Sequence, residues 1–233
     1  MRFQRFVKGA TKISMMGLPL PSNDFAIELD AILPGDLPRR EIVVACASRH
    51  LEMIVEINEV MNLTRITTPR DAAIKHVLDS VMPWRLFAGA KRVLDAGTGP
   101  GFPGLPLALV LPETSFTLAE STGKKARFVE SVISDLKIEN ARVLAERVED
   151  IGKREKFEIV TARAFAPMPK ALKMLAPLLK KGTRALLYKG PEVATEIAEA
   201  EREAKALGVV FEIVMRYELP DGLGTRNIVQ ITR

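Results

Sequence analysis

A glycine-rich segment at residues 95–104 has the residue types and the spacing of a ligand-binding loop. It follows a β-prone run at residues 92–96 and opens a helical stretch, a place where parallel sheets bind ligands. Four of its glycines fall within eight residues, which is costly unless the backbone must approach another molecule closely. Residues 99–104 match the G-x-G-x-x-G pattern of dinucleotide sites, and that match alone is weak. The segment therefore predicts a cofactor site for either a dinucleotide or S-adenosylmethionine.

Acidic residues end the first two β-prone runs, and one of them discriminates between these cofactors. Glu120 ends the second run and is able to bind ribose hydroxyls in either cofactor, so it does not discriminate. Asp95 stands two residues before Gly97, where a carboxylate would repel a pyrophosphate. Near the zwitterionic, sulfonium-bearing part of S-adenosylmethionine the same charge would be tolerated or favourable, directly or through water. The joint pattern favours methyl transfer.

The elements that would position this loop alternate between strands and helices from residue 91 onward. The first third of the chain instead reads as helical, over residues 38–61 and again from Asp71 to the residue before Pro83. β-prone runs follow at residues 92–96, 115–119, 141–145, 157–161, 184–188, 209–216 and 227–232, with helical stretches at 122–136, 169–179 and 193–207. This alternation predicts a parallel sheet with helices on both faces, and the glycine turn at 222–224 predicts a final antiparallel hairpin. The predicted fold class is α/β, in the seven-stranded, Rossmann-like layout of class I methyltransferases.

We therefore expect three parts. Residues 1–30 form a tail of uncertain order, residues 31–90 a helical segment packed on the core, and residues 91–233 the S-adenosylmethionine-binding methyltransferase domain. The tail carries basic residues before an apolar patch that is marginal in length for a signal peptide and is interrupted by Gly17 and Pro19. Met15 or Met16 is an alternative start.

Composition narrows the choice of partners and compartment. Cys46 is the one cysteine, so no internal disulfide or cysteine-ligated zinc is expected, and two histidines argue against a histidine-rich metal site. No apolar run approaches the ~20 residues of a membrane span. These features predict a cytoplasmic protein without metal or membrane, and the lack of an apolar surface stripe predicts a monomer. The net charge of +5 favours a polyanionic partner, although solvated surface lysines explain the same balance.

Several short stretches resemble the RsmG family, also called GidB, whose members methylate N7 of a guanine in small-subunit ribosomal RNA. Residues 94–104 are close to the family's D-x-G-T-G-x-G-F-P-G loop. Residues 62–66, 76–80, 121–128 and 163–166 match further family segments, among them N-L-T and H-x-L-D-S. The resemblance covers residues 56–233. It implies methylation of guanine N7 in the 530 loop of 16S ribosomal RNA, as naked RNA or in the 30S subunit, with S-adenosyl-L-methionine as cofactor.

The resemblance also implies roles for individual residues. Phe102 would stack near the adenosine or methionine part of the cofactor, and Val148 and Glu149 would meet the adenine. The full expected cofactor set is Asp95, Gly97, Gly99, Gly101, Phe102, Glu120, Ser121, Val148, Glu149 and Arg163. The catalytic set near the target base is His76, Arg163 and Lys189, and the RNA-binding set is Arg65, Lys124, Lys125 and Arg127. Ala96 and Glu120 depart from the family's usual valine and aspartate, and Glu120 keeps the carboxylate.

Guanine N7 carries a lone pair and no proton, so methylation there needs alignment of the base with the methyl donor and no general base.

Cys46 lies in the helical N-terminal part and is more typical of a core residue than of a nucleophile. An arginine flanked by apolar residues, as Arg163 is, predicts a fixed partner. His76 is either a site residue or a helix residue bonded to backbone, and Asp79, three residues on, would orient it.

The same sequence features fit other functions. Lys124, Lys125 and Arg127 also fit an exposed helix start, and Glu149 fits a solvated one. The alternatives to an rRNA methyltransferase are a methyltransferase on another RNA or a small molecule, and a non-catalytic RNA-binding protein of the same fold.

Overall fold

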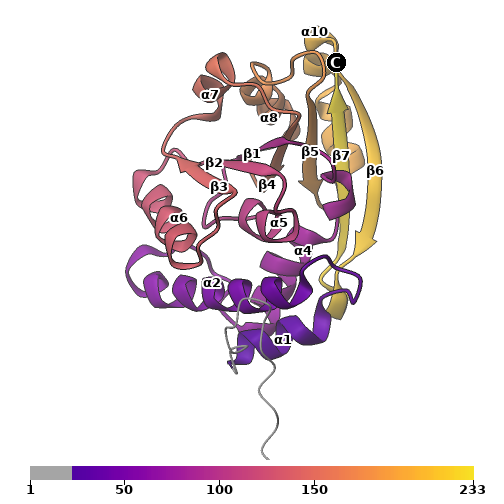
Figure 1. Cartoon of the computed structure of the whole chain (residues 1–233). Coiled ribbons are helices and arrows are strands. Elements are labelled where there is room, and N and C mark those ends of the chain that lie inside the picture. The colour runs from indigo at the N-terminus through magenta and orange to yellow at the C-terminus, as the bar shows by residue number, and fades with distance from the viewer. Residues whose placement is uncertain (1–22) are drawn as a thin grey trace, which may run out of the picture.

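A seven-stranded mixed sheet lies at the centre of the structure, a computed structural model that describes residues 23–233 (Figure 1). Its spatial order is β3-β2-β1-β4-β5-β7-β6. The strands are β1 (Arg92–Ala96), β2 (Ser115–Ala119), β3 (Ala141–Leu144), β4 (Ile159–Arg163), β5 (Arg184–Lys189), β6 (Val210–Glu218) and β7 (Thr225–Thr232). β1 to β5 pair in parallel, whereas β7 runs antiparallel to both β5 and β6. The predicted α/β fold with a final antiparallel hairpin is confirmed.

Two apolar clusters cover the two faces of this sheet. Successive strand residues point to opposite faces, and Val93 and Leu94 of β1 accordingly fall in different clusters, as do Ile159 and Val160 of β4. Six α-helices lie between the strands in the described sequence. Of these, α5 (Gly104–Val110) and α6 (Gly123–Asp135) contribute to the first cluster, and α7 (Val148–Arg154), α8 (Met168–Leu175), α9 (Val193–Glu199) and α10 (Glu201–Leu207) to the second. The central strands are therefore buried on both sides, which explains their nearly continuous apolar sequences.

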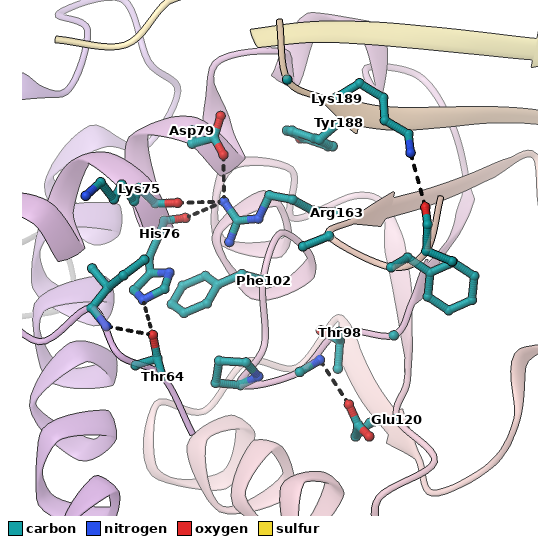
Figure 2. Close-up of a pocket in the computed structure, with 18 of the residues that line it drawn as sticks. Thr64, Lys75, His76, Asp79, Thr98, Phe102, Glu120, Arg163, Tyr188 and Lys189 are labelled. Carbon is teal, nitrogen blue, oxygen red and sulfur yellow. Dashed lines mark hydrogen bonds and ion pairs between the residues drawn. The ribbon is translucent and has the colours of Figure 1, made fainter. Parts of the chain in front are cut away.

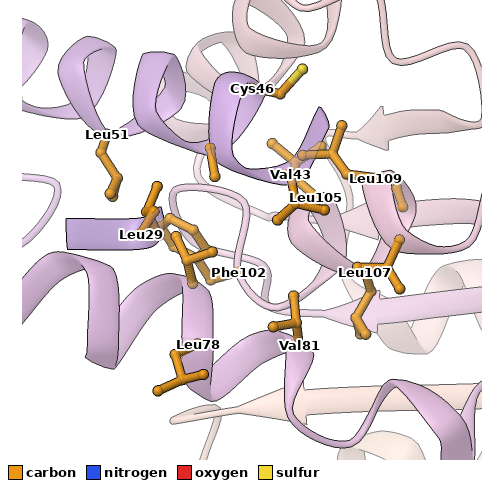
Figure 3. Close-up of a cluster of buried hydrophobic side chains, with 14 of the residues drawn as sticks. Leu29, Val43, Cys46, Leu51, Leu78, Val81, Phe102, Leu105, Leu107 and Leu109 are labelled. Carbon is orange, nitrogen blue, oxygen red and sulfur yellow. The ribbon is translucent and has the colours of Figure 1, made fainter. Parts of the chain in front are cut away.

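The N-terminal helices add a second layer over the first of these faces. They are α1 (Asp24–Ile32), α2 (Arg40–Met61), α3 (Pro69–Ala72), a π-helical turn (Ala73–Leu78), α4 (Asp79–Val81) and a 3-10 turn (Trp84–Leu86). Leu29 of α1 and Val43 of α2 are fully buried in one cluster with Leu105 of α5 (Figure 3). The helices and the sheet thus share a core rather than meeting at a polar interface.

The start of α1 lies inside the stretch for which the sequence predicts a tail. The Asn23 side chain caps this helix by accepting a hydrogen bond from the Ala26 amide at 2.7 Å. The rest of the expected tail, residues 1–22, and the alternative starts at Met15 and Met16 lie outside the described residues. Within residues 23–233, no helix is both long and apolar enough to cross a membrane.

Some predicted helix boundaries are wrong. The stretch predicted at 193–207 is two helices, α9 (Val193–Glu199) and α10, because the Ala200 amide bonds to the Ile197 carbonyl three residues back and closes α9. The stretch predicted at 169–179 begins earlier and ends as α8 at Leu175. The π-helical turn interrupts the helix predicted from Asp71, and that turn matters for the site.

Candidate functional site

A cleft of about 1090 Å³ opens at the C-terminal edge of the parallel strands (Figure 2). It lies beside β1, where the strand order reverses between β2 and β4, the usual position of ligand sites in such sheets. The loops after β1 and β4 line it, together with the end of β5, the π-helical turn and one residue of β7. The end of β2 and the start of α6 also contribute, and the predicted site residues that line the cleft are Gly97, Gly99, Phe102, Glu120, Lys125, Arg163, His76 and Lys189.

Three glycines of the loop after β1 adopt left-handed backbone conformations. Gly97, Gly99 and Gly101 have φ angles of 70°, 59° and 110°, which side-chain-bearing residues rarely adopt. A Cβ on Gly97 would lie 2.6 Å from the Phe165 ring, whereas one on Gly99 would meet nothing within 4 Å. The amides of Gly97 and Thr98 both donate to the Ala119 carbonyl, at 2.9 and 3.0 Å. The loop is therefore fixed to the end of β2 and open toward the cleft at Gly99.

Asp95 lies beneath this loop and not on the cleft wall. It is fully buried, and its Oδ2 accepts hydrogen bonds from the Thr98 hydroxyl at 2.6 Å and the Gly104 amide at 2.9 Å. Its Oδ1 has no hydrogen-bond partner among the described residues. Burial raises the pKa of this carboxyl to about 6, although the two hydrogen bonds act to lower it. Asp95 thus braces both ends of the loop from inside.

Of the acidic residues in the expected cofactor set, Glu120 is the one that lines the cleft. It accepts hydrogen bonds from the Gly99 amide at 3.2 Å and the Thr122 amide at 2.7 Å. Four other members of the expected cofactor set, Gly101, Ser121, Val148 and Glu149, are not among the described residues that line the cleft. Glu149 nevertheless keeps a buried Oε2 without a hydrogen-bond partner in the described chain.

Arg163, at the end of β4, has the fixed partner that its apolar surroundings predict. Its Nη1 donates to the Asp79 carboxylate at 3.0 Å and to the Lys75 carbonyl at 2.9 Å. The second contact exists because the π-helical turn pairs the Asp79 amide with the Ile74 carbonyl five residues back, so the wider turn leaves nearby carbonyls available. Ala164 follows with a φ of 50°, and such strained conformations gather at functional sites.

Asp79 joins β4 to the C-terminal hairpin. It is almost completely buried, accepts from the Tyr217 hydroxyl at 2.9 Å, and lies 3.5 Å from Nε of Arg226. Burial and the Asp79 charge raise the pKa of Tyr217, so the phenol stays protonated. Arg226 lines the cleft, and no local motif in the sequence marks it, because its link to Asp79 spans the whole domain.

His76 packs flat against Phe102, with ring centroids 4.7 Å apart and ring planes at 3°. Its Nε2 lies 3.3 Å from the Thr64 hydroxyl. Burial and the Arg163 charge lower the pKa of His76 to about 3, so the imidazole is neutral. The prediction that Asp79 orients His76 is wrong: the spacing rule for neighbouring helical residues fails across the π-helical turn, and Arg163 engages the Asp79 carboxylate instead.

The remaining predicted cations divide into paired and unpaired groups. Lys189 is held at 2.6 Å by Glu196 of α9, which also lines the cleft. The side chains of Arg65, Lys124, Lys125 and Arg127 form no ion pair or hydrogen bond with other described residues. Lys125 reaches the cleft, and Arg65 lies between two residues that line it, Thr64 and Ile66.

Cys46 is buried and burial raises its pKa, which agrees with a core role. In the described part of the chain, no three potential metal ligands cluster.

Comparison with known proteins gives a consistent family match. The family model described as "GidB: rRNA small subunit methyltransferase G" matches residues 44–223. The Ribosomal RNA small subunit methyltransferase G of Solibacter usitatus is 59% identical over 207 residues, covering 89% of this chain and 99% of that protein. The protein of the same name from Symbiobacterium thermophilum is 41% identical, covering 79% of each.

A solved structure supports the fold independently. The O-methyltransferase from Bacillus cereus in complex with SAH aligns with a TM-score of 0.56 at 18% identity, covering 88% of this chain and 94% of that one. At this identity the likeness concerns the fold alone.

Proposed function

This chain belongs to the GidB family of rRNA small subunit methyltransferases, and on that premise we propose that its cleft holds a guanine of 16S rRNA for methylation at N7. The enzyme depends on S-adenosyl-L-methionine. The observation that carries the proposal is the meeting of two sites in one cleft. The glycine loop and Glu120 form one wall, and the cluster of Arg163 with Asp79 forms another. A methyl donor and an acceptor base need adjoining sites of this kind.

The residues present fit S-adenosylmethionine. Glu120 offers a carboxylate at the end of β2 for ribose hydroxyls, and the open space at Gly99 lets a ligand approach the backbone. The unpartnered Oε2 of Glu149 offers an acceptor for an amino group such as that of adenine. When bound, the cofactor supplies an electrophilic methyl group on a sulfonium.

We assign the whole expected set to the cofactor pocket, but its members would contribute in different ways. Gly97, Gly99, Phe102, Glu120 and Arg163 line the cleft and would contact the ligand directly. Asp95 and Gly101 would act by shaping the loop, and Ser121, Val148 and Glu149 would form the outer end of the pocket. We also propose that the chain divides into a helical segment at residues 31–90 and a cofactor-binding domain at residues 91–233.

The chain's own residues would orient the target base rather than move its protons. N7 of guanine is a nucleophile without a proton to remove, and a neutral His76 with a pKa of about 3 is a poor general base at neutral pH. Arg163 is held by the Asp79 carboxylate and by the backbone of the π-helical turn, so it presents a fixed cation at the cleft. We assign Arg163, His76 and Lys189 to contact with the base.

The unpaired cations around the cleft suit an RNA strand. Arg65, Lys124, Lys125 and Arg127 would contact phosphates, which give affinity and its salt dependence. Because these four cations lie around the cleft, they suit a substrate with several phosphates, such as RNA, better than a small metabolite. We further propose that the protein works in the cytoplasm as a monomer, on 16S rRNA within the 530 loop, as naked RNA or in the 30S subunit.

Methylation with purified components tests this function. The wild type is mixed with S-adenosylmethionine and either protein-free 16S rRNA or 30S subunits from a strain lacking the gene. Mass-spectrometric mapping should find one 7-methylguanosine in the 530 loop. Methyl groups at another atom, or transfer only to small molecules, would refute the assignment. Micromolar binding of the cofactor without transfer to any RNA would favour a non-catalytic protein.

A further inference from the structure

A second buried histidine touches the cofactor loop from behind. His50, on α2, is 2% exposed and is not among the residues that line the cleft. Its Nε2 lies 2.8 Å from the Pro100 carbonyl oxygen, and its ring stacks on Phe102 with centroids 4.8 Å apart. Pro100 and Phe102 both line the cleft. One side chain of the N-terminal helical layer therefore contacts two loop residues that line the cleft.

The chemistry of the contact fixes the state of this imidazole. A carbonyl oxygen only accepts hydrogen bonds, so Nε2 of His50 carries the hydrogen and donates it to Pro100. Burial lowers the pKa of His50 to about 4, so the ring stays neutral above that pH. The contact is thus a neutral hydrogen bond with a defined tautomer.

The neighbouring glycine shows how closely the ring fits the loop. Gly101 has a φ of 110°, and a Cβ there would lie 3.1 Å from Cε1 of His50 and 2.6 Å from Leu105. The His50 ring occupies the space on this side of the loop. Figure 3 shows that apolar side chains surround Phe102. The loop has little freedom to retreat from the cleft.

We infer that His50 is a positioning residue for the methyl-donor site, acting through Pro100 and Phe102. The inference rests on the proposed function, since it takes the loop as the cofactor's wall. His50 holds the Pro100 carbonyl away from the cleft and sets the tilt of the Phe102 ring. The N-terminal helices thereby pre-organise the cofactor loop before the ligand arrives, which reduces the ordering required on binding.

Three variants separate positioning from general support of the core. His50→Gln keeps an amide N–H at nearly the position of Nε2, and His50→Phe keeps a ring but loses the donor. Leu51→Ala is the matched control, because Leu51 is equally buried on α2 and one helical residue turns it about 100° away. Calorimetry measures the dissociation constant for S-adenosylmethionine, and hydrogen exchange measures the amides of Gly101 and Phe102 without ligand.

We expect His50→Phe to weaken cofactor binding about fivefold to tenfold, the effect of one hydrogen bond, and to speed exchange at Gly101 and Phe102. His50→Gln should restore affinity to within about threefold. Leu51→Ala should lower the melting temperature and leave the affinity within about twofold. These margins follow from the ordinary size of a single contact.

Each result has one meaning. A wild type that ignores S-adenosylmethionine defeats the proposed function, whatever the variants do. A wild type that binds, together with a folded His50→Phe that binds equally well and exchanges equally slowly, overturns the inference alone. If His50→Phe does not fold, His50→Leu, which also lacks the donor, takes its place: affinity weaker than that of His50→Gln supports positioning, and affinity equal to that of the wild type in a folded protein overturns it.

Discussion

Replacing Asp95 by asparagine tests the account of the loop most directly. This carboxylate is fully buried, with two hydrogen bonds on Oδ2 and none on Oδ1. In Asp95→Asn the amide oxygen is able to keep the bonds from Thr98 and Gly104. The amide nitrogen then takes the place of Oδ1 without an acceptor, a cost of about 1–3 kcal/mol that does not depend on pH.

The size of the pH effect follows from the raised pKa. Burial moves the pKa of Asp95 from its ordinary 3.8 to about 6, so the folded protein binds this proton more tightly than the unfolded chain. Stability from the protonated form is complete below about pH 4 and is lost as the pH rises through about 6. A shift of about two units corresponds to about 3 kcal/mol. Asparagine cannot ionise, so the variant escapes this loss.

Urea unfolding followed by circular dichroism, from pH 4 to pH 8, measures the outcome. The free energy of unfolding of the variant minus that of the wild type should rise by about 2.4 kcal/mol across this range, because the unfolded carboxyl is already partly ionised at pH 4. Titrations common to both proteins cancel in the difference. A difference that does not change with pH would refute the reasoning, and so would a wild type that gains relative stability as the pH rises.

Three further substitutions test other parts of the site. Gly101→Ala should destabilise the protein by about 1–3 kcal/mol because of its φ of 110° and the contacts a Cβ would make, whereas Gly35→Ala, in open space, should not shift the urea midpoint. Asp79→Asn leaves the guanidinium of Arg163, 15% exposed, without its buried counter-charge; we expect a loss of about 3–5 kcal/mol by urea unfolding and at least tenfold slower methylation. Lys125→Gln should lower the slope of log affinity for 16S rRNA against log salt by about 0.7–0.9, measured by filter binding, if that lysine contacts a phosphate; an unchanged slope would remove it from the interface.

The parts of the fold that local sequence determines were predictable. β-branched and apolar runs predict all seven strands, because strands buried on both faces need continuous apolar sequence. The order of strands and helices then predicts the parallel sheet and the place of the site. The glycine loop carries its own signal, since left-handed φ angles at Gly97, Gly99 and Gly101 require glycine there.

The contacts between distant segments were not predictable in this way. Arg226 reaches Asp79 across 147 positions, and His50 reaches Pro100 across 50, and no periodicity encodes such pairs. The position of Asp95 at the end of a strand predicts a ligand-facing side chain. Whether the side chain turns into the cleft or under the loop depends on the close packing of Gly104 beside it, where a Cβ would lie 2.7 Å from Asp95 Oδ2.

The π-helical turn at Ala73–Leu78 makes this segment sensitive to the deletion of a residue. Deleting one residue there would let the segment close as a regular α-helix, a geometry with better hydrogen bonds. The same deletion would rotate one side of the helix against the other by about 100° and withdraw the Lys75 carbonyl from Arg163. A shorter, regular helix would therefore position Arg163 less well at the cleft. The extra residue of the π-helical turn thus contributes to the geometry of the site.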